Sequence, residues 1–392
     1  MWLSSGIYYL PGVSQNLQKP LSLGNKEDKD NPARQPSHII LQTFRKIQSL
    51  QKCKRPFMKI LVFEVNWLGD VVLSTPVFKT IKENFPSSSV AVALHPRTRP
   101  LLEYNPYIDK IIEFDERGLQ RPFRKKIEFV KFIRREKFDK VILLHRSFTR
   151  ALLCLLAGIP ERIGYSTPKR RLILAKPISP PPGLIHRQDY YLYLLKRAGF
   201  KITERVSHIY VRDEHRRYAQ DILQGLERKV LIGMHCSGNW PLKRWPYFAE
   251  LLNLFKDFDW GIVLVGSSKE EALINSLLSK VNDSVRRRII NLAGKTSLLE
   301  LAAVCERLDC FVSSDSGPLH IASSIGTKTV GIFGPTHPEI TSPRGPASSK
   351  ILFKDVGCSI PCYVKACPWD LKCLRSINPE EVLKAIREII EE

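Results

Sequence analysis

The stretch CFVSSDSGPLHIASSIGTKTVGIFGPTH, residues 310–337, decides the fold of this chain. Its opening apolar run, 310–313, is typical of a buried strand, and small polar residues follow at once. A helical segment then covers 318–325 and ends at Gly326, and a second apolar run starts at Thr329. A strand, a tight turn, a helix and a second strand in this order predict a βαβ unit.

The turn of this unit carries four residues that suit an anion site: Asp315, Ser316, Gly317 and His320. It lies at the carboxyl end of a strand and the amino end of a helix, where free backbone N–H groups and the helix dipole attract phosphate. A simple N-cap would explain the serine alone. The histidine and the second turn, Gly-Pro-Thr at 334–336, favour a phosphate-binding site.

Similar apolar runs alternate with helical segments over most of the chain. The predicted strands are 59–65, 90–95, 110–115, 140–145 and 162–166 in a first series, and 229–236, 260–266, 288–294, 310–316 and 329–335 in a second. Apolar strands separated by helices predict parallel, doubly wound α/β sheets, one Rossmann-like domain for each series. A single helix is expected over 70–85, and a last one over 379–391.

The chain is expected to divide into three parts. Residues 1–56 are polar and weakly patterned, and we interpret them as a flexible basic leader. The Pro-rich segment 176–186 breaks the α/β pattern, so the first Rossmann-like domain is placed at 57–200 and the second at 201–392. Two such domains leave a cleft between the carboxyl ends of their sheets.

The composition is that of a globular protein with an uneven charge. No apolar run approaches the ~18 residues of a membrane span, and the amino end lacks a basic signal-peptide region, so a cytoplasmic location is expected. Residues 1–200 hold 35 Lys and Arg against 16 Asp and Glu (+19), whereas 201–392 hold 26 against 23 (+3). This one-sided excess favours an anionic partner: nucleic acid, an anionic membrane surface or an acidic substrate.

Four further residues lie in loops at the predicted cleft. Asp70 follows the first strand and could be a general base or only a helix cap. Lys243, near a predicted helix start, could bind a diphosphate or face solvent. Glu270 could accept hydrogen bonds from a ribose or merely begin a helix, and Thr296 could border a base pocket. The first strand lacks a Gly-x-Gly-x-x-Gly turn, so no dinucleotide cofactor is expected.

Five segments in order make this chain resemble the lipopolysaccharide heptosyltransferases of glycosyltransferase family nine, which use ADP-heptose and have a GT-B fold. The segments are KILVFEVNWLGDVVLSTPVFKTIKE, GMHCSGNWPLKRWPYFAELLNLF, LVGSSKEE, NLAGKTSLLELAAV and SDSGPLHIASSIGTKTVGIFGPTHP, and the resemblance covers about 59–377. The NWLGD turn and the Cys-rich tail are more similar to the second heptosyltransferases than to the first.

The resemblance implies an inverting, metal-independent transfer of heptose from ADP-heptose to the lipopolysaccharide inner core. Asp70 falls on the family's general base, and Lys243 on the lysine that binds the donor diphosphate. Cations and helix N-termini would stabilise the leaving group. The other implied donor-binding residues are Ser237, Glu270 at the ribose, Thr296 at the adenine, and Asp315, Ser316, Gly317 and His320 at the diphosphate and sugar. Ser316 stands where a threonine is frequent in the family.

The expected acceptor is a lipid-linked, anionic sugar at the inner face of the cytoplasmic membrane, with the enzyme bound peripherally. Arginines in or near loops of the first domain are candidates for contacting it: Arg97, Arg99, Arg146, Arg150 and Arg162. Two alternatives stay open: a family member with another nucleotide-sugar or acceptor, and a basic nucleic-acid-binding protein. No recognisable nucleic-acid-binding motif accompanies the charge, so no nucleic-acid partner is expected.

Four of the nine cysteines cluster in the tail segment 358–373, at Cys358, Cys362, Cys367 and Cys373. Their spacing, C-x3-C-x4-C-x5-C, is not that of a standard pair of CxxC motifs. Four thiols could bind a structural Zn²⁺ tetrahedrally, form disulfides or simply pack. No catalytic role is expected for them.

Overall fold

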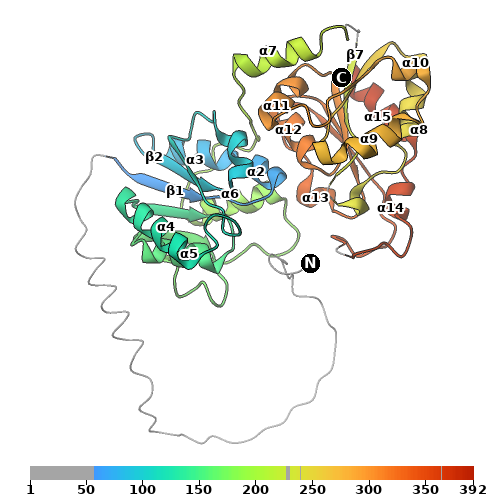
Figure 1. The fold of residues 1–392 in the computed structure, drawn as a ribbon. Helices are drawn as coiled ribbons and strands as arrows, with labels where there is room; N and C mark the ends of the chain where they lie inside the picture. The colour runs from blue at the N-terminus through green and yellow to red at the C-terminus, as the bar shows by residue number, and fades with distance from the viewer. Residues whose placement is uncertain (1–56, 227–229, 239, 363) are drawn as a thin grey trace, which may run out of the picture. The chain divides into compact units, whose positions relative to one another are not determined.

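The structure, a computed structural model, describes residues 57–226, 230–238, 240–362 and 364–392, so the predicted leader lies outside the described residues. The described chain forms two six-stranded sheets (Figure 1), and all neighbouring strands in them are parallel. This is the predicted α/β class.

The first sheet has the order β3-β2-β1-β4-β5-β6. Its strands are β1 Lys59–Phe63, β2 Ser89–Leu94, β3 Lys110–Glu113, β4 Lys140–Leu143, β5 Glu161–Tyr165 and β6 Lys176–Ile178. The central strand β1 is almost entirely apolar because helices cover both faces of the sheet, and Ile60 through Phe63 are all buried. Ile60 is in register with Val90 on one side and Lys140 on the other.

Two groups of helices cover this sheet. The helices are α2 Leu68–Ser74, α3 Pro76–Asn84, α4 Phe123–Glu136, α5 Phe148–Leu156 and α6 Arg187–Arg197, with the 3-10 helix η2 Pro96–Leu102 after β2. The buried side chains of α2, α3 and α6 belong to one core cluster, and those of α4 and α5 to another. The two clusters therefore lie on opposite faces of the sheet.

Two local predictions for this half were wrong. The single helix predicted over 70–85 is two helices, because Pro76 has no N–H to donate and its ring disfavours a continuous helix; it begins α3 instead. The Pro-rich segment predicted to break the pattern contains β6, with Pro177 inside it. Proline is tolerated there because β6 is an edge strand.

The second sheet has the order β12-β11-β10-β7-β8-β9. Its strands are β7 Val230–His235, β8 Trp260–Leu264, β9 Ile289–Asn291, β10 Cys310–Ser314, β11 Thr329–Phe333 and β12 Ser349–Phe353. Strand β12 was not predicted, since SKILF is only half-buried and carries a weak apolar signal.

The helices of this half surround its sheet. They are α7 Asp213–Ile222, α8 Phe248–Leu254, α9 Glu271–Leu278, α10 Asp283–Arg286, α11 Leu298–Glu306, α12 Gly317–Ile325, α13 Pro338–Thr341, α14 Lys372–Arg375 and α15 Pro379–Glu391, with the 3-10 helices η3 Pro241–Lys243, η4 Phe255–Asp257 and η5 Ser268–Glu270. Among the described residues, none of these or the earlier helices combines the length and apolarity that crossing a bilayer requires.

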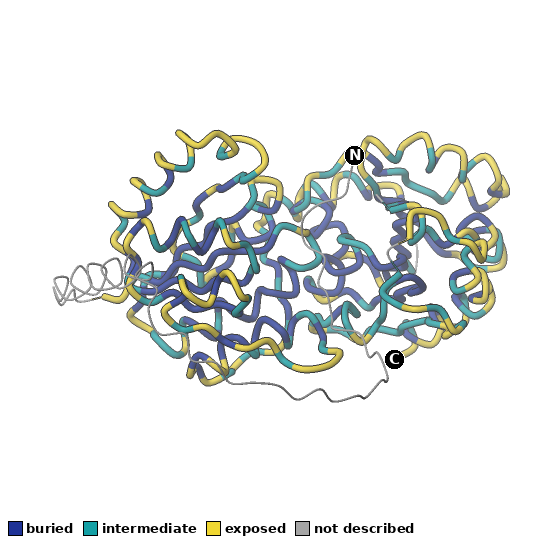
Figure 2. Tube along the Cα trace, turned by 90° about the horizontal axis from the view of Figure 1, so that it is seen from below, coloured by how far each residue is buried: buried dark blue, intermediate teal, exposed yellow. Residues whose placement is uncertain are grey.

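The two series share one apolar core. A single cluster joins Val71 and Val72 of α2 to Leu319 and Ile321 of α12, and all four side chains are buried. Figure 2 shows the buried segments running through the interior of the sheets, with exposed segments outside them. The amino-terminal turns of α2 and α12 also pack together, with Gly69 against His320 and Gly317 against Leu68.

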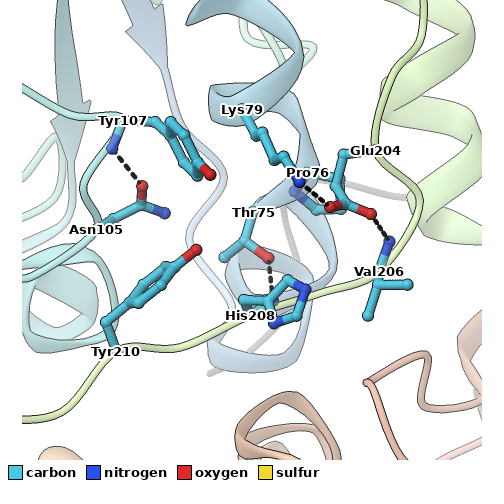
Figure 3. Close-up of a pocket in the computed structure, with 9 residues that line it drawn as sticks. All are labelled: Thr75, Pro76, Lys79, Asn105, Tyr107, Glu204, Val206, His208 and Tyr210. Atoms are coloured by element: carbon cyan, nitrogen blue, oxygen red, sulfur yellow. Dashed lines mark hydrogen bonds and ion pairs between the residues drawn. The ribbon is translucent and has the colours of Figure 1, made fainter. Parts of the chain in front are cut away.

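The segment that connects the two series of strands is held by local contacts. Figure 3 shows a small pocket where residues 204–210 lie against the start of α3. Lys79 pairs with Glu204 at 2.8 Å, and the His208 N–H donates to Thr75 Oγ1 at 3.1 Å. These contacts attach the connecting segment to the first sheet's helices, and we assign the pocket no ligand.

Candidate active site

A buried carboxylate, Asp315, organises the turn after β10. Its Oδ2 accepts hydrogen bonds from Lys243 Nζ at 2.6 Å and from Thr336 Oγ1 at 2.7 Å. Its Oδ1 lies 3.6 Å from His320 Nε2. One side chain thus ties together three loops: η3, the first turn of α12, and the turn after β11.

The ionised form of the Asp315 carboxyl is strongly favoured over the protonated form. Burial by itself would raise the pKa of this carboxyl, but the Lys243 ammonium and His320 outweigh that effect and hold the pKa well below its usual range. Lys243 is consequently held in place as a cation and stays partly exposed. A partly exposed ammonium with hydrogens to spare is suited to bind an anion.

The start of α12 supplies further donors. Ser316 is the N-cap and accepts a hydrogen bond from the Leu319 N–H, while its hydroxyl also contacts Ser313 Oγ at 2.8 Å. Gly317 begins the helix against Leu68 of α2, whose Cβ would lie 3.2 Å from any Cβ added at 317. This close approach explains the glycine, and it leaves the helix start free of bulky side chains.

The Asp70 turn meets this helix start directly. The ring of His320 lies against Gly69, where an added Cβ would lie 2.7 Å from His320 Cδ2. The structure therefore brings Asp70, predicted from the first series, beside residues predicted from the second. Among the described residues, His320 Nδ1 is a buried atom without a hydrogen-bond partner.

Asp70 has a cationic neighbour that sequence reasoning missed. The Nε atom of Arg187, the first residue of α6, lies 3.3 Å from Asp70 Oδ1, and both side chains are about one-fifth exposed. A planar guanidinium beside a carboxylate fixes its orientation. In the sequence, Arg187 is visible only as an arginine that follows a Pro-rich loop. That position does not by itself indicate a contact with Asp70.

Two arginines hold the turn that carries Asp70. The buried Arg150 donates to the carbonyl of Glu64 and, at 2.7 Å, to Asn66 Oδ1. Arg97 Nη2 donates to the Asn66 carbonyl at 2.9 Å, and its guanidinium carbon lies 5.6 Å from the centre of the Trp67 ring. Arg150, proposed above as an acceptor contact, is thus a support of the turn.

Glu64 is a second buried carboxyl beneath the same turn. Its Oε2 accepts a hydrogen bond from the Val65 N–H at 2.6 Å, and its Oε1 contacts Ser74 Oγ. Burial raises the pKa of Glu64 to about 8. Because Ser74 Oγ also donates its one proton to the Val71 carbonyl at 2.8 Å, a protonated Glu64 satisfies both groups.

A second cluster lies at the ends of β7 and β8. Glu270 Oε2 accepts from Ser267 N and Oγ at 2.7 and 2.8 Å, and its Oε1 lies 3.6 Å from His235 Nε2. Ser237 Oγ lies 3.3 Å from the same His235 atom. Burial alone would raise the pKa of Glu270, but hydrogen bonds from His235, Ser267 and Ser237 hold it well below its usual range.

Hydrogen bonds connect the two clusters. His235 Nδ1 lies 3.3 Å from Ser313 Oγ, which in turn contacts Ser316 Oγ. His235 was not singled out from the sequence, where it is one residue of a buried strand. Thr296 lies in neither cluster: it precedes Ser297, the N-cap of α11.

Two of the remaining arginine candidates, Arg162 and Arg99, have other roles. Arg162 is buried and donates to the carbonyls of Pro160 and Ile173, at 3.0 and 2.8 Å. Arg99 pairs with Glu113 at 2.9 Å on the surface. The proposal that Arg162 contacts the acceptor was wrong, because its guanidinium is used inside the fold.

The tail cysteines pack behind the turn after β11. The Cys362 N–H donates to the Pro335 carbonyl at 2.7 Å, the Leu371 N–H donates to Cys367 Sγ at 3.3 Å, and Cys373 Sγ would lie 3.0 Å from a Cβ added at Gly334. The four thiols are free. In the described ranges, no group of three or more His, Cys, Asp or Glu residues is placed to hold a metal ion.

Two Rossmann-like sheets, with a carboxylate and a helix N-terminus brought together from their carboxyl ends, are the arrangement of a GT-B glycosyltransferase. The chain belongs to glycosyltransferase family 9 (heptosyltransferase), whose sequence profile matches residues 127–372. It is 27% identical over 303 residues to lipopolysaccharide heptosyltransferase 2 of Escherichia coli, covering 73% of this chain and 85% of that protein. The predicted family and enzyme class are confirmed.

Solved structures agree with the fold. The glycosyl transferase family 9 protein of Veillonella parvula superposes with a TM-score of 0.77 at 27% identity, covering 85% of this chain and 97% of that one. The E. coli ADP-heptose lps heptosyltransferase II superposes with a TM-score of 0.71 at 23% identity, covering 85% and 99%. The predicted GT-B fold is therefore confirmed.

Proposed function

We propose that this chain transfers a heptose from ADP-heptose to the inner core of a lipid-linked lipopolysaccharide acceptor. The observation that carries the proposal is the packing of the Asp70 turn against the α12 start through Gly69 and His320. A base and an anion-binding site on adjoining turns are what sugar transfer from a nucleoside diphosphate requires. The relatives' names support heptose as the sugar and lipopolysaccharide as the acceptor.

Asp70 is the general base of this mechanism. Its carboxylate accepts the proton of the acceptor hydroxyl as that oxygen attacks the anomeric carbon of the heptose. The bond from this carbon to the diphosphate oxygen breaks on the opposite side, so the configuration at the carbon inverts. Arg187 orients the base through its 3.3 Å contact.

The leaving ADP carries the developing negative charge. Lys243 and the backbone N–H groups at the start of α12 stabilise this charge without recruiting a metal ion. Asp315 holds the ammonium of Lys243 in position, and Ser316 and Gly317 let the diphosphate approach the helix start. His320 lies between the diphosphate site and the acceptor turn, where the donor sugar would sit.

The nucleoside would extend toward the second cluster. Glu270 and Ser237 lie at the ends of neighbouring strands, as required of groups that meet a ribose. Thr296 lies before α11 at the same edge of the sheet and is proposed to meet the adenine through its backbone. The second half, 201–392, is the donor domain in this proposal, and 57–200 the acceptor domain.

The acceptor is proposed to be anionic and bound to the inner face of the cytoplasmic membrane, with the enzyme held there peripherally. The +19 charge of residues 1–200, from 35 cations and 16 acids, supports this arrangement. Arg97, Arg146 and Arg187 lie in or next to turns at the carboxyl edge of the first sheet, near Asp70 or close to its strand. They are the cations that we assign to the acceptor.

The test is a transfer assay of the full chain with a panel of nucleotide-sugars and a lipid-linked inner-core acceptor. ADP-heptose should be the productive donor. Asp70→Asn should lower the transfer rate by roughly two or more powers of ten and leave ADP affinity unchanged, because base catalysis contributes about that factor. Asp257→Asn, at an exposed residue of η4, is the matched control and should behave like the parent protein.

Two results would contradict the proposal. Efficient transfer from a different nucleotide-sugar, with none from ADP-heptose, would show that the chain uses another donor. Near-normal turnover by the Asp70→Asn variant would show that Asp70 is not the general base.

A further inference from the structure

Exposed apolar side chains are concentrated in the first half of the described chain. Of the thirteen large hydrophobic residues that are exposed among the described residues, eleven precede residue 200 and two follow it. The same half carries the excess positive charge. A surface that exposes apolar side chains among many cations is suited to a partner that has both apolar and anionic groups.

Four of these side chains lie along one edge of the first sheet. Leu119 and Phe123 follow β3, Phe148 follows β4 and Leu172 follows β5, and the carboxyl ends of parallel strands meet at one edge. We call this set the apolar rim. Its members are exposed by 67%, 76%, 41% and 87% respectively.

The three loops of the apolar rim converge. Glu116, after β3, pairs with Arg150 of α5 at 3.4 Å between Oε2 and Nε. His145, after β4, interacts electrostatically with three arginines, one following each of the strands β3, β4 and β5. Burial first, and then the charges of Arg150, Arg170 and Arg117, lower the pKa of His145 to about 3. β4 and β5 are neighbouring strands and α4 packs against α5, so the three loops are neighbours.

Cations are interleaved with the apolar rim. Between 117 and 135 the sequence holds eight Lys or Arg residues and one acid, Glu128. The exposed basic residues beside the rim include Arg121, Arg124, Lys125, Lys169 and Arg171. Glu128 pairs with Lys125 at 2.7 Å and reduces the local charge only slightly.

We propose that the apolar rim inserts into the interfacial layer of an anionic lipid bilayer while the surrounding cations bind the headgroups. Separate apolar side chains that alternate with Lys and Arg match this interface, which accepts both kinds of group at different depths. A protein partner fits less well, because the centres of protein interfaces are depleted of charge. The proposal rests on the proposed function, since a lipid-linked acceptor requires the enzyme at a membrane.

The placement has a consequence for the reaction. Asp70 lies in the turn after β1, at the carboxyl edge that also carries the apolar rim. Insertion of the rim would present this edge to the headgroup layer, where the sugars of a lipid-linked acceptor lie. Docking and acceptor capture thus use one side of the first half.

The experiment is flotation of the full chain with vesicles of phosphatidylglycerol and phosphatidylethanolamine, and with phosphatidylcholine vesicles as the uncharged comparison, at low and high salt. The rim variant carries Leu119→Ser, Phe123→Ser and Leu172→Ser. The matched control carries Val364→Ser and Trp369→Ser, the two large apolar residues that are exposed in the described part of the second half. Every variant keeps residues 1–56, so a difference between variants reports on the rim.

The parent protein and the control should bind anionic vesicles, and a fraction should stay bound at high salt because insertion is not screened. The rim variant should bind at least tenfold less and be fully released by salt. Equal binding by the rim variant and the control would overturn the proposal. Failure of the parent protein to bind the anionic vesicles would overturn it as well.

A transfer assay separates this inference from the proposed function. With a deacylated, water-soluble acceptor the rim variant should match the parent, whereas with the acceptor in vesicles its KM should rise severalfold. Loss of transfer to the soluble acceptor, with an unchanged melting temperature, would place these residues in the catalytic site and overturn docking as their role. Absence of transfer by the parent itself would refute the proposed function, and flotation would still decide the role of the rim.

Discussion

Removal of the Lys243 ammonium should separate its structural role from its role in binding the donor. Lys243→Ala leaves the buried Asp315 carboxylate without its 2.6 Å partner. Removing one member of a buried ion pair costs about 3–5 kcal/mol. Thr336 still donates at 2.7 Å and His320 lies at 3.6 Å, so we expect the lower end of that range, about 3 kcal/mol.

The second change, Asp315→Asn in the same chain, removes the unpaired charge. The double variant should recover most of the lost stability, because a neutral amide costs far less to bury than a carboxylate. It should not recover ADP affinity, since a charge-assisted hydrogen bond to phosphate contributes about 1.5–3 kcal/mol, which is tenfold or more in affinity. Urea unfolding at pH 7 measures the first quantity and calorimetric titration with ADP the second.

Two outcomes would contradict these roles of Lys243. Unchanged stability in Lys243→Ala would mean that the ion pair does not hold the turn. Unchanged ADP affinity would place the ammonium in solvent, as the sequence alone allowed. Lys256→Ala, an exposed lysine in η4, is the control and should alter neither quantity.

Three further outcomes are expected. Gly69→Ala should lower transfer at least tenfold and destabilise the fold by about 1–3 kcal/mol, since the added Cβ forces the buried His320 ring to move; normal kinetics and melting would contradict the contact. Arg187→Met should reduce kcat about tenfold without changing ADP affinity, because Asp70 loses its orienting partner; a change in ADP affinity alone would oppose this. Glu64 has a folded pKa of about 8, above the ~4.3 of an unfolded chain, so its contribution to stability is lost as the pH rises between these values. Glu64→Gln should flatten that dependence in urea unfolding at pH 5 and pH 8, and an unaltered slope would show that the group does not titrate there.

Much of the fold could be predicted because its strands are apolar on both faces. The predicted and observed bounds of the last helix coincide at 379–391, where Asn378 caps the helix by accepting from the Glu381 N–H at 2.8 Å. Two of the four edge strands, β6 and β12, were missed, because an edge strand needs no continuous apolar run and does not need every N–H for pairing. The other two edge strands, β3 and β9, kept enough apolar residues to be predicted.

The residues of the candidate site could be named one by one from the sequence, but the contacts among them could not. Asp315 and His320 share one turn, so their sequence pattern was visible. The pairing of Lys243 with Asp315 spans 72 residues and depends on how three loops meet. Arg187 and Glu64 were missed for a related reason, because burial and proximity to Asp70 arise only after the sheet and its helices assemble.

The strand order has a consequence for how the protein is made. β1 lies at the centre of its sheet, yet its partner β4 begins 81 residues after β1 does, at Lys140, and Arg150 and Arg187, which set the Asp70 turn, follow later still. In the second half, α15 packs the buried Val382, Ile386 and Ile389 into the core beside the sheet. These residues are the last part of that core to be synthesised. The first half can therefore be completed only after α6, Arg187–Arg197, has been synthesised, and the second only after α15; such long-range pairing folds slowly.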